Sequence, residues 1–367
     1  MAEHALQPPV RRRLVDAPET GHNRWHPDIE PALEVASGDE ILVDCRDGVD
    51  GQITPLTTDA ELALVDFDAP HPMTGPILVQ GAKPGDVLRV DILDVRTDTF
   101  GCTPIVPGFG LLADRFPDHY LVTWGLHDGV ATSGRIPGVR VPQDAFIGVI
   151  GVAPSAERLR RWNEREAAVG ALPPTARSAV PTAEPIASTG ARTIPPRELG
   201  GNLDVAQVRK GATVFLPVDV DGALLSLGDV HFAQGDGEVC AFAIETHGQA
   251  RIRVEVLSDV RHRPATPLIE SSEPAFRNER RTVSTIGLPI DEDGRVHPMD
   301  TTLAARNAIA EMIRWLGDEA GLAPEPAYAL CSAVVDLRIS EIVDVPHPVV
   351  SALCPTDIFH EIRETRG

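Results

Sequence analysis

Basic and aromatic residues are scarce in this chain, and each shortage narrows what the protein can be. The 367 residues include 33 Lys and Arg against 54 Asp and Glu, so the formal net charge is −21. A protein this acidic repels phosphate groups, which argues against nucleic acid or an anionic membrane as a partner and favours a small neutral substrate. Aromatic side chains make up only 4% of the residues, so Val, Ile, Leu and Ala must fill the core. The hydrophobic fraction of 43% is still ample for a folded chain of two or three packed parts.

Paired cysteines and long apolar runs are also missing. The five cysteines are spread along the chain without a CxxC pair, which predicts reduced thiols and a cytoplasmic protein. The sequence contains no run of about 18 apolar residues that would predict a membrane span. No apolar segment follows Arg11–Arg13 as it would in a signal peptide.

Several catalytic and nucleotide-binding motifs are absent as well. There is no G-x-S-x-G elbow, no P-loop, and no G-x-G-x-x-G between a strand and a helix. Lys83 and Lys210 are the only lysines, so an amidase signature with a catalytic lysine is unsupported. Cys240 stands in a Val-Cys-Ala setting that predicts a buried, inert thiol.

Short apolar segments separated by Gly and Pro turns predict a β-rich fold. The expected strands of the first half are residues 40–44, 77–80, 87–93, 120–124, 139–141 and 147–152. The turn Lys83–Asp86 contains Pro-Gly-Asp, which would let the strands on either side of it pair. The regular short spacing favours a sandwich or a barrel over a doubly wound α/β sheet.

Two helices and a long connection complete the expected organisation. Ser155 can cap a charged helix that runs to Val169, and residues 301–321 carry apolar side chains at helical spacing. The segment 327–342 fits either a helix or a strand. We therefore predict an α+β, mainly β chain with an N-terminal β-rich half (1–169), a Pro-rich connection (170–199) and a C-terminal β-rich half (200–367) that contains the helix 301–321.

The stretch Gly228–Glu238 holds the densest set of metal-binding and acid–base groups. Three glycines space its polar residues, which are Asp229, His231, Gln234, Asp236 and Glu238. The segments 214–218 and 239–244 around it read as buried strands. A histidine beside carboxylates, with one position open, is the usual arrangement of a zinc hydrolase. The bland alternative is that Gly-Asp-Gly-Glu forms only a turn.

Three other places offer partners for this stretch. His71 lies beside small residues near an expected strand end. The acidic turn 46–52 either only reverses the chain or presents Asp44 and Asp47 to a cation. Asn202 and Asp204 follow a pair of glycines, which permit unusual backbone angles or the close approach of a ligand.

The polar stretch and its surroundings resemble the acetamidase/formamidase family. The residues that carry the resemblance are Pro195–Asp204, Gly211–Val218, Gly222–Cys240, His71–Ile77, Gly81–Asp86, Phe146–Pro154 and Asp336–Ile339. The resemblance implies a β-rich fold and a cytoplasmic homo-oligomer that hydrolyses short amides such as formamide or acetamide. It also implies a bound divalent metal, zinc. Relatives that act on a γ-lactam keep a lactam, a carbamate or a larger amide open as the substrate, and a non-catalytic metal-binding relative is a further alternative.

The site residues are interpreted together with this resemblance. The metal ligands are predicted to be His71, Asp229, His231, Asp44 and Asp47. Glu238 and Asp236 are the predicted catalytic acid–base groups. The predicted substrate-binding residues are Asn202, Asp204, Gln234 and Phe242.

Two positions depart from the family pattern. The family usually has Gly before the histidine, where this chain has Val230, and a β-branched residue disfavours positive φ. Phe242 stands where a small residue is usual, so it would narrow the pocket if it points inward.

Overall fold

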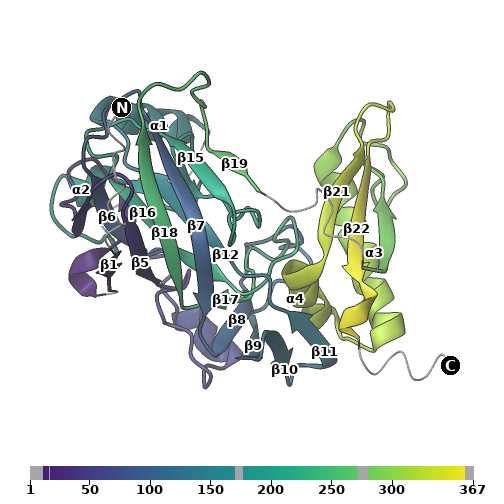
Figure 1. Ribbon diagram of the computed structural model, residues 1–367. Coiled ribbons are helices and arrows are strands. Elements are labelled where there is room, and N and C mark those ends of the chain that lie inside the picture. Colours follow the sequence, from purple (N-terminus) through teal and green to yellow (C-terminus); the bar gives the residue numbers. More distant parts are fainter. Residues whose placement is uncertain (1–10, 16, 170–176, 272–279, 360–367) are drawn as a thin grey trace, which may run out of the picture.

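The computed structural model describes residues 11–15, 17–169, 177–271 and 280–359. Strands dominate it, which confirms the predicted α+β, mainly β class. Figure 1 shows a large β body and, beside it, a smaller unit formed by the last part of the chain. Among the helices of the described residues, none is long and apolar enough to cross a membrane.

A six-stranded sheet forms one layer of the body, with the strand order β1–β5–β18–β7–β15–β19. Its strands are β1 (Arg11–Leu14), β5 (Glu40–Cys45), β7 (Val87–Thr97), β15 (Thr213–Pro217), β18 (Gly248–Leu257) and β19 (Leu268–Glu270). The long strands β7 and β18 pair antiparallel at its centre. This sheet contains strands from before residue 169 and from after residue 200, with β18 inserted between β5 and β7, so the two halves of the sequence are interleaved in space.

An eleven-stranded sheet forms the other layer, with β11–β10–β9–β8–β17–β16–β12–β14 along its main path and β6, β2 and β4 attached through β16. Its strands are β2 (Gly21–His22), β4 (Leu33–Val35), β6 (Met73–Val79), β8 (Phe100–Ile105), β9 (Tyr120–His127), β10 (Val130–Ser133), β11 (Ile136–Pro142), β12 (Phe146–Val152), β14 (Gly200–Asn202), β16 (Leu225–His231) and β17 (Glu245–Thr246). This sheet also takes strands from both halves of the sequence.

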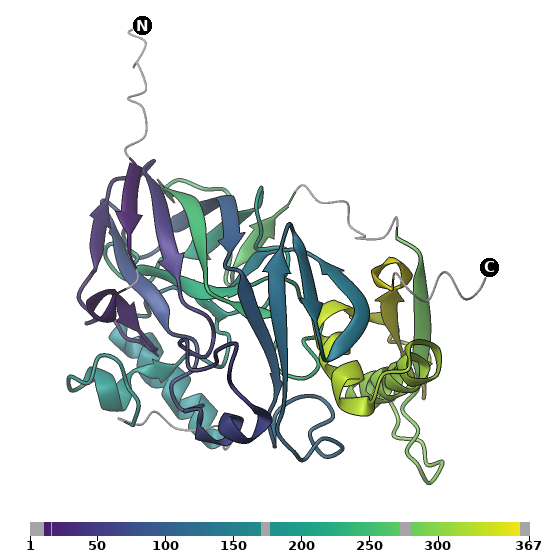
Figure 2. The ribbon, with the colours of Figure 1, turned by 90° about the horizontal axis from the view of Figure 1, so that it is seen from below.

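The C-terminal unit consists of a three-stranded sheet and two helices. The sheet order is β20 (Thr282–Gly287), β22 (Val349–Pro355) and β21 (Asp336–Glu341). Helix α3 (Thr301–Ala320) packs on β20 and β22, and helix α4 (Pro324–Val334) lies on the side of the unit that faces the body (Figures 1 and 2). The predicted helix at 301–321 is confirmed, and Asp300 caps it. The ambiguous segment 327–342 contains most of α4 followed by β21.

The remaining elements lie around the body. Helix α1 (Ala156–Ala168) begins as predicted after Ser155, whose hydroxyl accepts a hydrogen bond from the backbone N–H of Arg158. The described part of the Pro-rich connection contains α2 (Ile186–Thr189) and β13 (Ala191–Arg192), which pairs with β3 (Arg24–Trp25). Residues 170–176 of that connection lie outside the described residues. The 3-10 helices are η1 (Pro18–Thr20), η2 (Asp59–Leu64) and η3 (Thr356–Ile358).

Two main hydrophobic cores hold these layers together. The first fills the space between the two large sheets and includes Ile41, Val90, Ile147 and Leu227. The second lies between the β8–β11 part of the large sheet and helices α3 and α4. β12 and β16 are buried at every position, because sheet neighbours and the core cover both of their faces. The polar end of β16 is therefore held inside the protein.

Two local expectations are wrong. The turn Lys83–Asp86 does not join a hairpin, because β6 and β7 belong to different sheets and the turn carries the chain from one layer to the other. The segment 239–244 is not a strand. It is a buried series of turns in which Ala241 has φ of 72°, and its apolar residues pack against α4 and the second core.

The contact between β20 and α3 gives a first prediction. A Cβ added to Gly287 would lie 1.9 Å from the Ala304 carbonyl oxygen and 2.5 Å from the Ala308 nitrogen. Gly287→Ala should therefore lower the free energy of unfolding by about 3 kcal/mol, measured by urea denaturation. The control is Gly134→Ala, where an added Cβ would meet no atom within 4 Å. Equal stability of the two variants would contradict this packing.

Candidate metal centre

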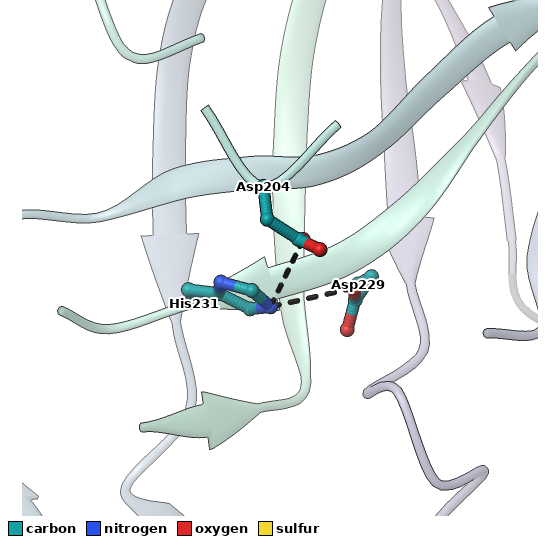
Figure 3. A group of neighbouring side chains, drawn as sticks. All are labelled: Asp204, Asp229 and His231. Atoms are coloured by element: carbon teal, nitrogen blue, oxygen red, sulfur yellow. Dashed lines mark ion pairs between the residues drawn. The ribbon is translucent and has the colours of Figure 1, made fainter. Parts of the chain in front are cut away.

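One imidazole nitrogen and three carboxylates converge inside the β body. The Nε2 atom of His231 lies 3.3 Å from Asp229 Oδ2, 3.3 Å from Glu245 Oε2 and 4.0 Å from Asp204 Oδ1. Figure 3 shows His231 between Asp204 and Asp229, with both contacts dashed. Asp229, His231 and Glu245 have exposed fractions of only 2%, 1% and 3%. These three residues are thus almost completely removed from water, and the Asp204 side chain is 17% exposed.

The sheet pairing explains why these side chains meet. Asp229 and His231 are two residues apart on β16, so their side chains leave the same face of the strand. Glu245 on β17 is the direct partner of His231 in the antiparallel ladder. Asp204 follows β14, and its backbone N–H donates to the Gly148 carbonyl of β12, 3.2 Å away. The adjacent strands β17 and β16, together with the loop after β14 that is held on β12, therefore deliver the four groups to one point.

The backbone around the cluster is unusually strained. Positive φ angles occur at His71 (52°), Asp204 (48°), Asp229 (59°), Glu238 (42°) and Ala241 (72°), none of which is glycine. Such conformations cost of order 1 kcal/mol or more each and persist only where the surrounding structure enforces them. The sharp bend falls on Asp229, and Val230 is not among the residues with positive φ. The β-branched residue at 230 is therefore compatible with this bend.

Two glycines leave space next to the carboxylates. A Cβ on Gly48 would lie 2.6 Å from Asp229 Oδ1 and 3.1 Å from Glu245 Oε2. A Cβ on Gly148 would lie 2.7 Å from Asp204 Oδ1 and 2.8 Å from Asp229 Oδ2. Neither glycine has a positive φ, so space and not backbone conformation is what a side chain at these positions would violate.

The donor set fits a divalent cation. Asp204 Oδ1, Asp229 Oδ1 and Glu245 Oε2 are buried and accept no hydrogen bond. Leaving such oxygens unpaired is costly, and a bound cation removes the cost. The ligand atoms of Asp204, Asp229 and His231 all lie within 4.8 Å of one another, and so do those of His231, Glu238 and Glu245. Histidine nitrogen with carboxylate oxygens is a ligand set that Zn²⁺ accepts.

The pKa values of the clustered side chains are shifted by burial and by their charged neighbours. Burial raises the pKa of Asp204 to about 6 and the pKa of Glu245 to about 7, although the charge of His231 opposes both shifts. Burial also raises the pKa of Glu238 well above its usual value, and the neighbouring Asp204 adds to this effect. Burial acts to lower the pKa of His231, but Glu245 and Asp229 outweigh it and raise that pKa well above 6.5. Burial acts to raise the pKa of Asp229, yet its contacts with His231 lower it overall.

The C-terminal unit fixes the loop that follows β16. The Gly235 N–H donates to the Ser332 carbonyl of α4 over 2.8 Å, and the Ser332 hydroxyl donates to the Phe242 carbonyl over 2.7 Å. The Tyr328 hydroxyl, also on α4, donates to the Val239 carbonyl. A Cβ on Gly235 would lie only 2.3 Å from the Val335 carbonyl oxygen. Helix α4 is thus part of the scaffold of the site.

The predicted metal ligands lie at different distances from the cluster. His71 lies close enough for its charge to act on Asp204 and Asp229, and its Nδ1 atom is buried without a hydrogen bond. Asp47 accepts the backbone N–H groups of Val49 and Gly51, and burial raises its pKa, with a contribution from nearby Asp229.

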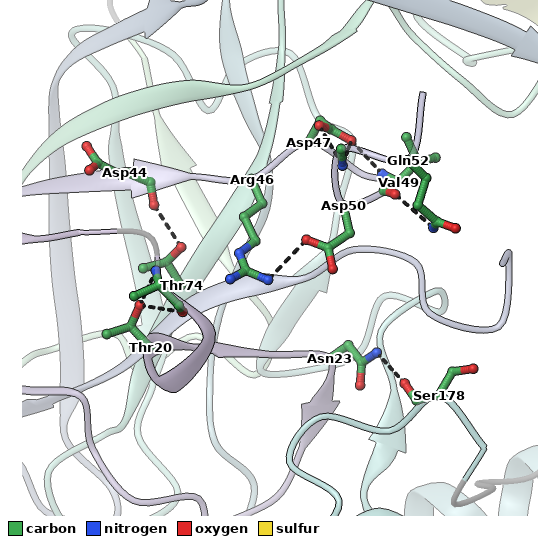
Figure 4. A network of polar contacts seen from close by, with 12 residues as sticks. Thr20, Asn23, Asp44, Arg46, Asp47, Val49, Asp50, Gln52, Thr74 and Ser178 are labelled. Carbon is green, nitrogen blue, oxygen red and sulfur yellow. Dashed lines mark hydrogen bonds and ion pairs between the residues drawn. The ribbon is translucent and has the colours of Figure 1, made fainter. Parts of the chain in front are cut away.

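Asp44 lies apart from this cluster. Its carboxylate accepts hydrogen bonds from Arg13 (3.1 Å) and Gln249 (2.7 Å). Figure 4 shows it apart from Asp47 and Asp50, with its backbone carbonyl bound to Thr74. These two hydrogen bonds hold the Asp44 carboxylate at the six-stranded sheet, away from the cluster.

Some of the predicted catalytic and substrate-binding residues lie at the cluster, and others are held by contacts elsewhere. Glu238 belongs to a cation-capable group, and Asp204, predicted to bind substrate, does too. The backbone N–H of Asp236 is bound to Asp336, which ties this residue to the start of β21. Asn202 donates to the Ile194 carbonyl and keeps a buried, unpaired Oδ1 atom.

Gln234 and Phe242 lie on either side of the loop. The Gln234 amide bridges His231 and the Asp204 backbone. The ring of Phe242 is 6.0 Å from that of Phe67 and packs on a small apolar cluster with Val49 and Cys102. Cys240 is buried as predicted, and burial raises its pKa to about 12, which disfavours the reactive thiolate.

Sequence reasoning missed Glu245. It follows a segment that reads as an apolar strand, and no motif marks it. A usable signal was present: a carboxylate placed directly after a fully apolar run is expected to be buried, and buried carboxylates require a partner. The roles of Gly48 and Gly148 were missed for a similar reason, since glycines in turns and strands are common.

The chain is similar to several known proteins along most of its length. The model of the Acetamidase/Formamidase family matches residues 9–361. A formamidase of Methylophilus methylotrophus is 37% identical, with 92% of this chain and 89% of that protein covered. An acetamidase of Mycolicibacterium smegmatis is 36% identical, with 87% of this chain and 86% of that protein covered. The solved structure of a gamma lactamase from Delftia acidovorans superposes with a TM-score of 0.89 at 33% identity, covering 95% of this chain and 93% of that chain.

Replacement of Glu245 tests the donor set. Glu245→Gln keeps the size of the side chain but removes the charge that faces His231, so the affinity for Zn²⁺ should fall at least about 100-fold. Isothermal titration calorimetry on protein stripped of cations measures this. The control is Glu61→Gln, which alters an exposed carboxylate bound to Thr58. Equal Zn²⁺ affinities of the two variants would remove Glu245 from the ligand set.

The raised carboxyl pKa values predict how cation binding depends on pH. Without a cation, folded Asp204 and Glu245 keep protons up to about pH 6 and 7, whereas their ordinary values are 3.8 and 4.5. Their contribution to stability is therefore complete below about pH 4 and is lost as the pH rises through 6 to 7. A cation displaces these protons. Its affinity should rise between pH 5 and pH 7.5, with proton release at pH 6.

Calorimetry in two buffers of different ionisation enthalpy counts the released protons. His22, whose pKa burial lowers to about 4, titrates equally with and without the cation and does not disturb the comparison. Binding without proton release, or affinity that falls with rising pH, would show that the cation binds elsewhere.

Proposed function

This chain belongs to the acetamidase/formamidase family, and we propose that it hydrolyses short linear amides of the formamide or acetamide type to a carboxylate and ammonia. It is a hydrolase of carbon–nitrogen bonds other than peptide bonds. The observation that carries the proposal is the buried cluster of one histidine and three carboxylates with unsatisfied oxygens. A small neutral amide also suits a chain with a net charge of −21.

The proposed cofactor is a divalent metal, zinc, held by Asp204, Asp229, His231 and Glu245, with His71 nearby. When bound, such a cation supplies Lewis acidity, which activates a water molecule and polarises the amide carbonyl. The residues of the chain supply the rest. Burial keeps bulk water from the ligands, and the strained turns at Asp204 and Asp229 hold their carboxylates in fixed positions.

Glu238 is the proposed acid–base residue. Burial and the neighbouring Asp204 raise its pKa well above the usual value, which favours the protonated form of this carboxyl group. A protonated carboxyl group beside the reacting amide can give that proton to the departing nitrogen. Asp236 was the second candidate. We assign the role to Glu238, because Glu238 belongs to a cation-capable group and the Asp236 backbone is tied to β21.

The remaining parts of the proposal concern the cellular state. We propose a cytoplasmic homo-oligomer, as the family resemblance implies. The five free, buried cysteines are consistent with a reducing compartment. Exposed apolar side chains on the C-terminal unit, Ile286 (54%) and Ile339 (60%), offer a surface for a second copy of the chain.

A cyclic amide is the second candidate substrate. The superposition on the Delftia acidovorans gamma lactamase favours it, since the two chains share their fold over nearly their whole length. Phe242 supports it as well, because its contact with Phe67 belongs to an apolar cluster beside the carboxylates. Lactam opening breaks the same type of bond but leaves the amine attached to the product, so it releases no ammonia.

An assay of ammonia release and lactam opening tests the proposal. Zn²⁺-loaded protein should release ammonia from formamide or acetamide. His231→Ala should abolish the activity and lower the bound metal, because it removes the only nitrogen of the cluster. Glu238→Gln should retain the metal and lower kcat by roughly 100-fold to 10,000-fold, as expected for loss of an acid–base group.

Two control variants show whether the losses are specific to His231 and Glu238. Asp236→Asn should change kcat by less than about 10-fold, since losing a true acid–base group costs more. His262→Ala, at an exposed position, should change nothing. Full activity of His231→Ala would overturn the assignment. Lactam opening without ammonia release from any linear amide would favour the second candidate.

A further inference from the structure

Gln234 makes two hydrogen bonds that reach both sides of the metal centre. It lies three residues after His231 and is only 4% exposed. Its Oε1 atom is 2.8 Å from His231 Nδ1, and its Nε2 atom donates to the Asp204 carbonyl oxygen over 2.9 Å. One side-chain amide therefore joins the loop after β16 to the loop after β14.

The direction of these bonds follows from the chemistry of the groups. A backbone carbonyl oxygen can only accept, so the NH₂ end of Gln234 must face Asp204. The amide oxygen then faces the imidazole, and since that oxygen also only accepts, Nδ1 of His231 must carry the proton. The lone pair of the neutral ring is consequently on Nε2, the atom that faces Asp229 and Glu245.

The alternative tautomer would disable the ring as a ligand. A proton on Nε2 would be attracted by the two carboxylates 3.3 Å away and would occupy the position of a cation. Nothing in the contacts of Nε2 prevents this, because both neighbours are acceptors. Only the contact at Nδ1 selects the tautomer, and Phe146, whose ring is 4.9 Å from the imidazole in an edge contact, carries no polar group.

The second hydrogen bond, from Gln234 to the Asp204 carbonyl, supports the backbone of Asp204. Asp204 has φ of 48°, a conformation that needs support from its surroundings. The Gln234 amide holds its carbonyl, while Gly148 accepts its N–H. The carbonyl and the side chain of Asp204 leave the same Cα atom, so fixing the peptide unit also directs Oδ1 toward His231.

We propose that Gln234 is a positioning residue that keeps the proton on His231 Nδ1 and holds the Asp204 peptide, so that His231 Nε2 and Asp204 Oδ1 face one cation. This inference rests on the proposed metal centre, but it concerns the tautomer of the neutral His231 ring, which can be measured without the metal. It assigns Gln234 a role distinct from direct substrate binding.

Two variants separate the two hydrogen bonds. Gln234→Met keeps a similar volume and removes both bonds. Gln234→Glu keeps an acceptor for Nδ1 but places a carboxylate against the Asp204 carbonyl. Gln80→Met is the control, because Gln80 is an exposed glutamine whose side chain donates to Glu34 on the surface.

Imidazole ¹⁵N NMR on protein stripped of cations reads the tautomer directly, at a pH where the His231 ring is neutral. Wild type, Gln80→Met and Gln234→Glu should show the proton on Nδ1. Gln234→Met should move the proton wholly or partly to Nε2. The Zn²⁺ affinity of Gln234→Met should fall about 10-fold to 100-fold, the usual effect of removing a group that orients a metal ligand.

Gln234→Met with an unchanged tautomer and Zn²⁺ affinity within 2-fold of wild type would overturn the inference, even if its melting temperature fell, because Gln234 would then be only a packing residue. Failure of the proposed function has a different signature. Wild-type protein would bind no Zn²⁺ and hydrolyse no amide, while the NMR comparison would still decide the tautomer.

Discussion

Like charges confined in a small buried volume are the constraint on which this structure depends. Asp229 and Glu245 are removed from water and Asp204 is only partly exposed, with His231 between them and His71 nearby. The mutual repulsion of the carboxylates in a medium of low dielectric constant is large unless a positive charge neutralises it. Within the part of the chain that the structure describes, no lysine or arginine pairs with these carboxylates. The fold leaves the oxygens unpaired, so the cluster is stable either with bound protons or with a bound cation.

Strand β16 and its two neighbours in the sheet hold this cluster in place. β16 runs through the middle of the body, with apolar residues in its first part and the polar pair Asp229 and His231 at its end. Its neighbours β12 and β17 supply the space and the third carboxylate. Because both sheets mix strands from the two halves of the sequence, the site cannot be assigned to either half. Positive φ angles at several non-glycine residues show that the surrounding packing overcomes local preference.

Much of the fold could be predicted from sequence, and the failures have common causes. Helices α1 and α3 were predictable, because a cap and a 3.6-residue period are local signals. The turn at 83–86 was misread because turn chemistry identifies a reversal but not the sheet to which each strand belongs. The segment 239–244 was misread as a strand, since an apolar run reports burial and not conformation.

In the site, too, residues close together in sequence were predictable and residues brought together by the fold were not. The stretch from Asp229 to Glu238 was recognisable, because its polar groups are close together in sequence. Glu245 was not recognisable, because its partner across the ladder, His231, is fourteen residues earlier. The register of a strand pair cannot be deduced from the local sequence. Asp44 looked similar to Asp47 in sequence, but Arg13 and Gln249 bind its carboxylate on the sheet. Separating the two required coordinates of residues more than 200 positions apart.

The contacts between α4 and the loop after β16 have a consequence for biosynthesis. Ser332 and Tyr328 are hydrogen-bonded to the loop that carries Gln234 and Glu238, yet they are made about one hundred residues later. A ribosome that has completed the whole β body has therefore not yet supplied the residues that lock this loop. The nascent chain can lock this loop only after Tyr328 and Ser332 have emerged, so the candidate metal site is completed late in folding.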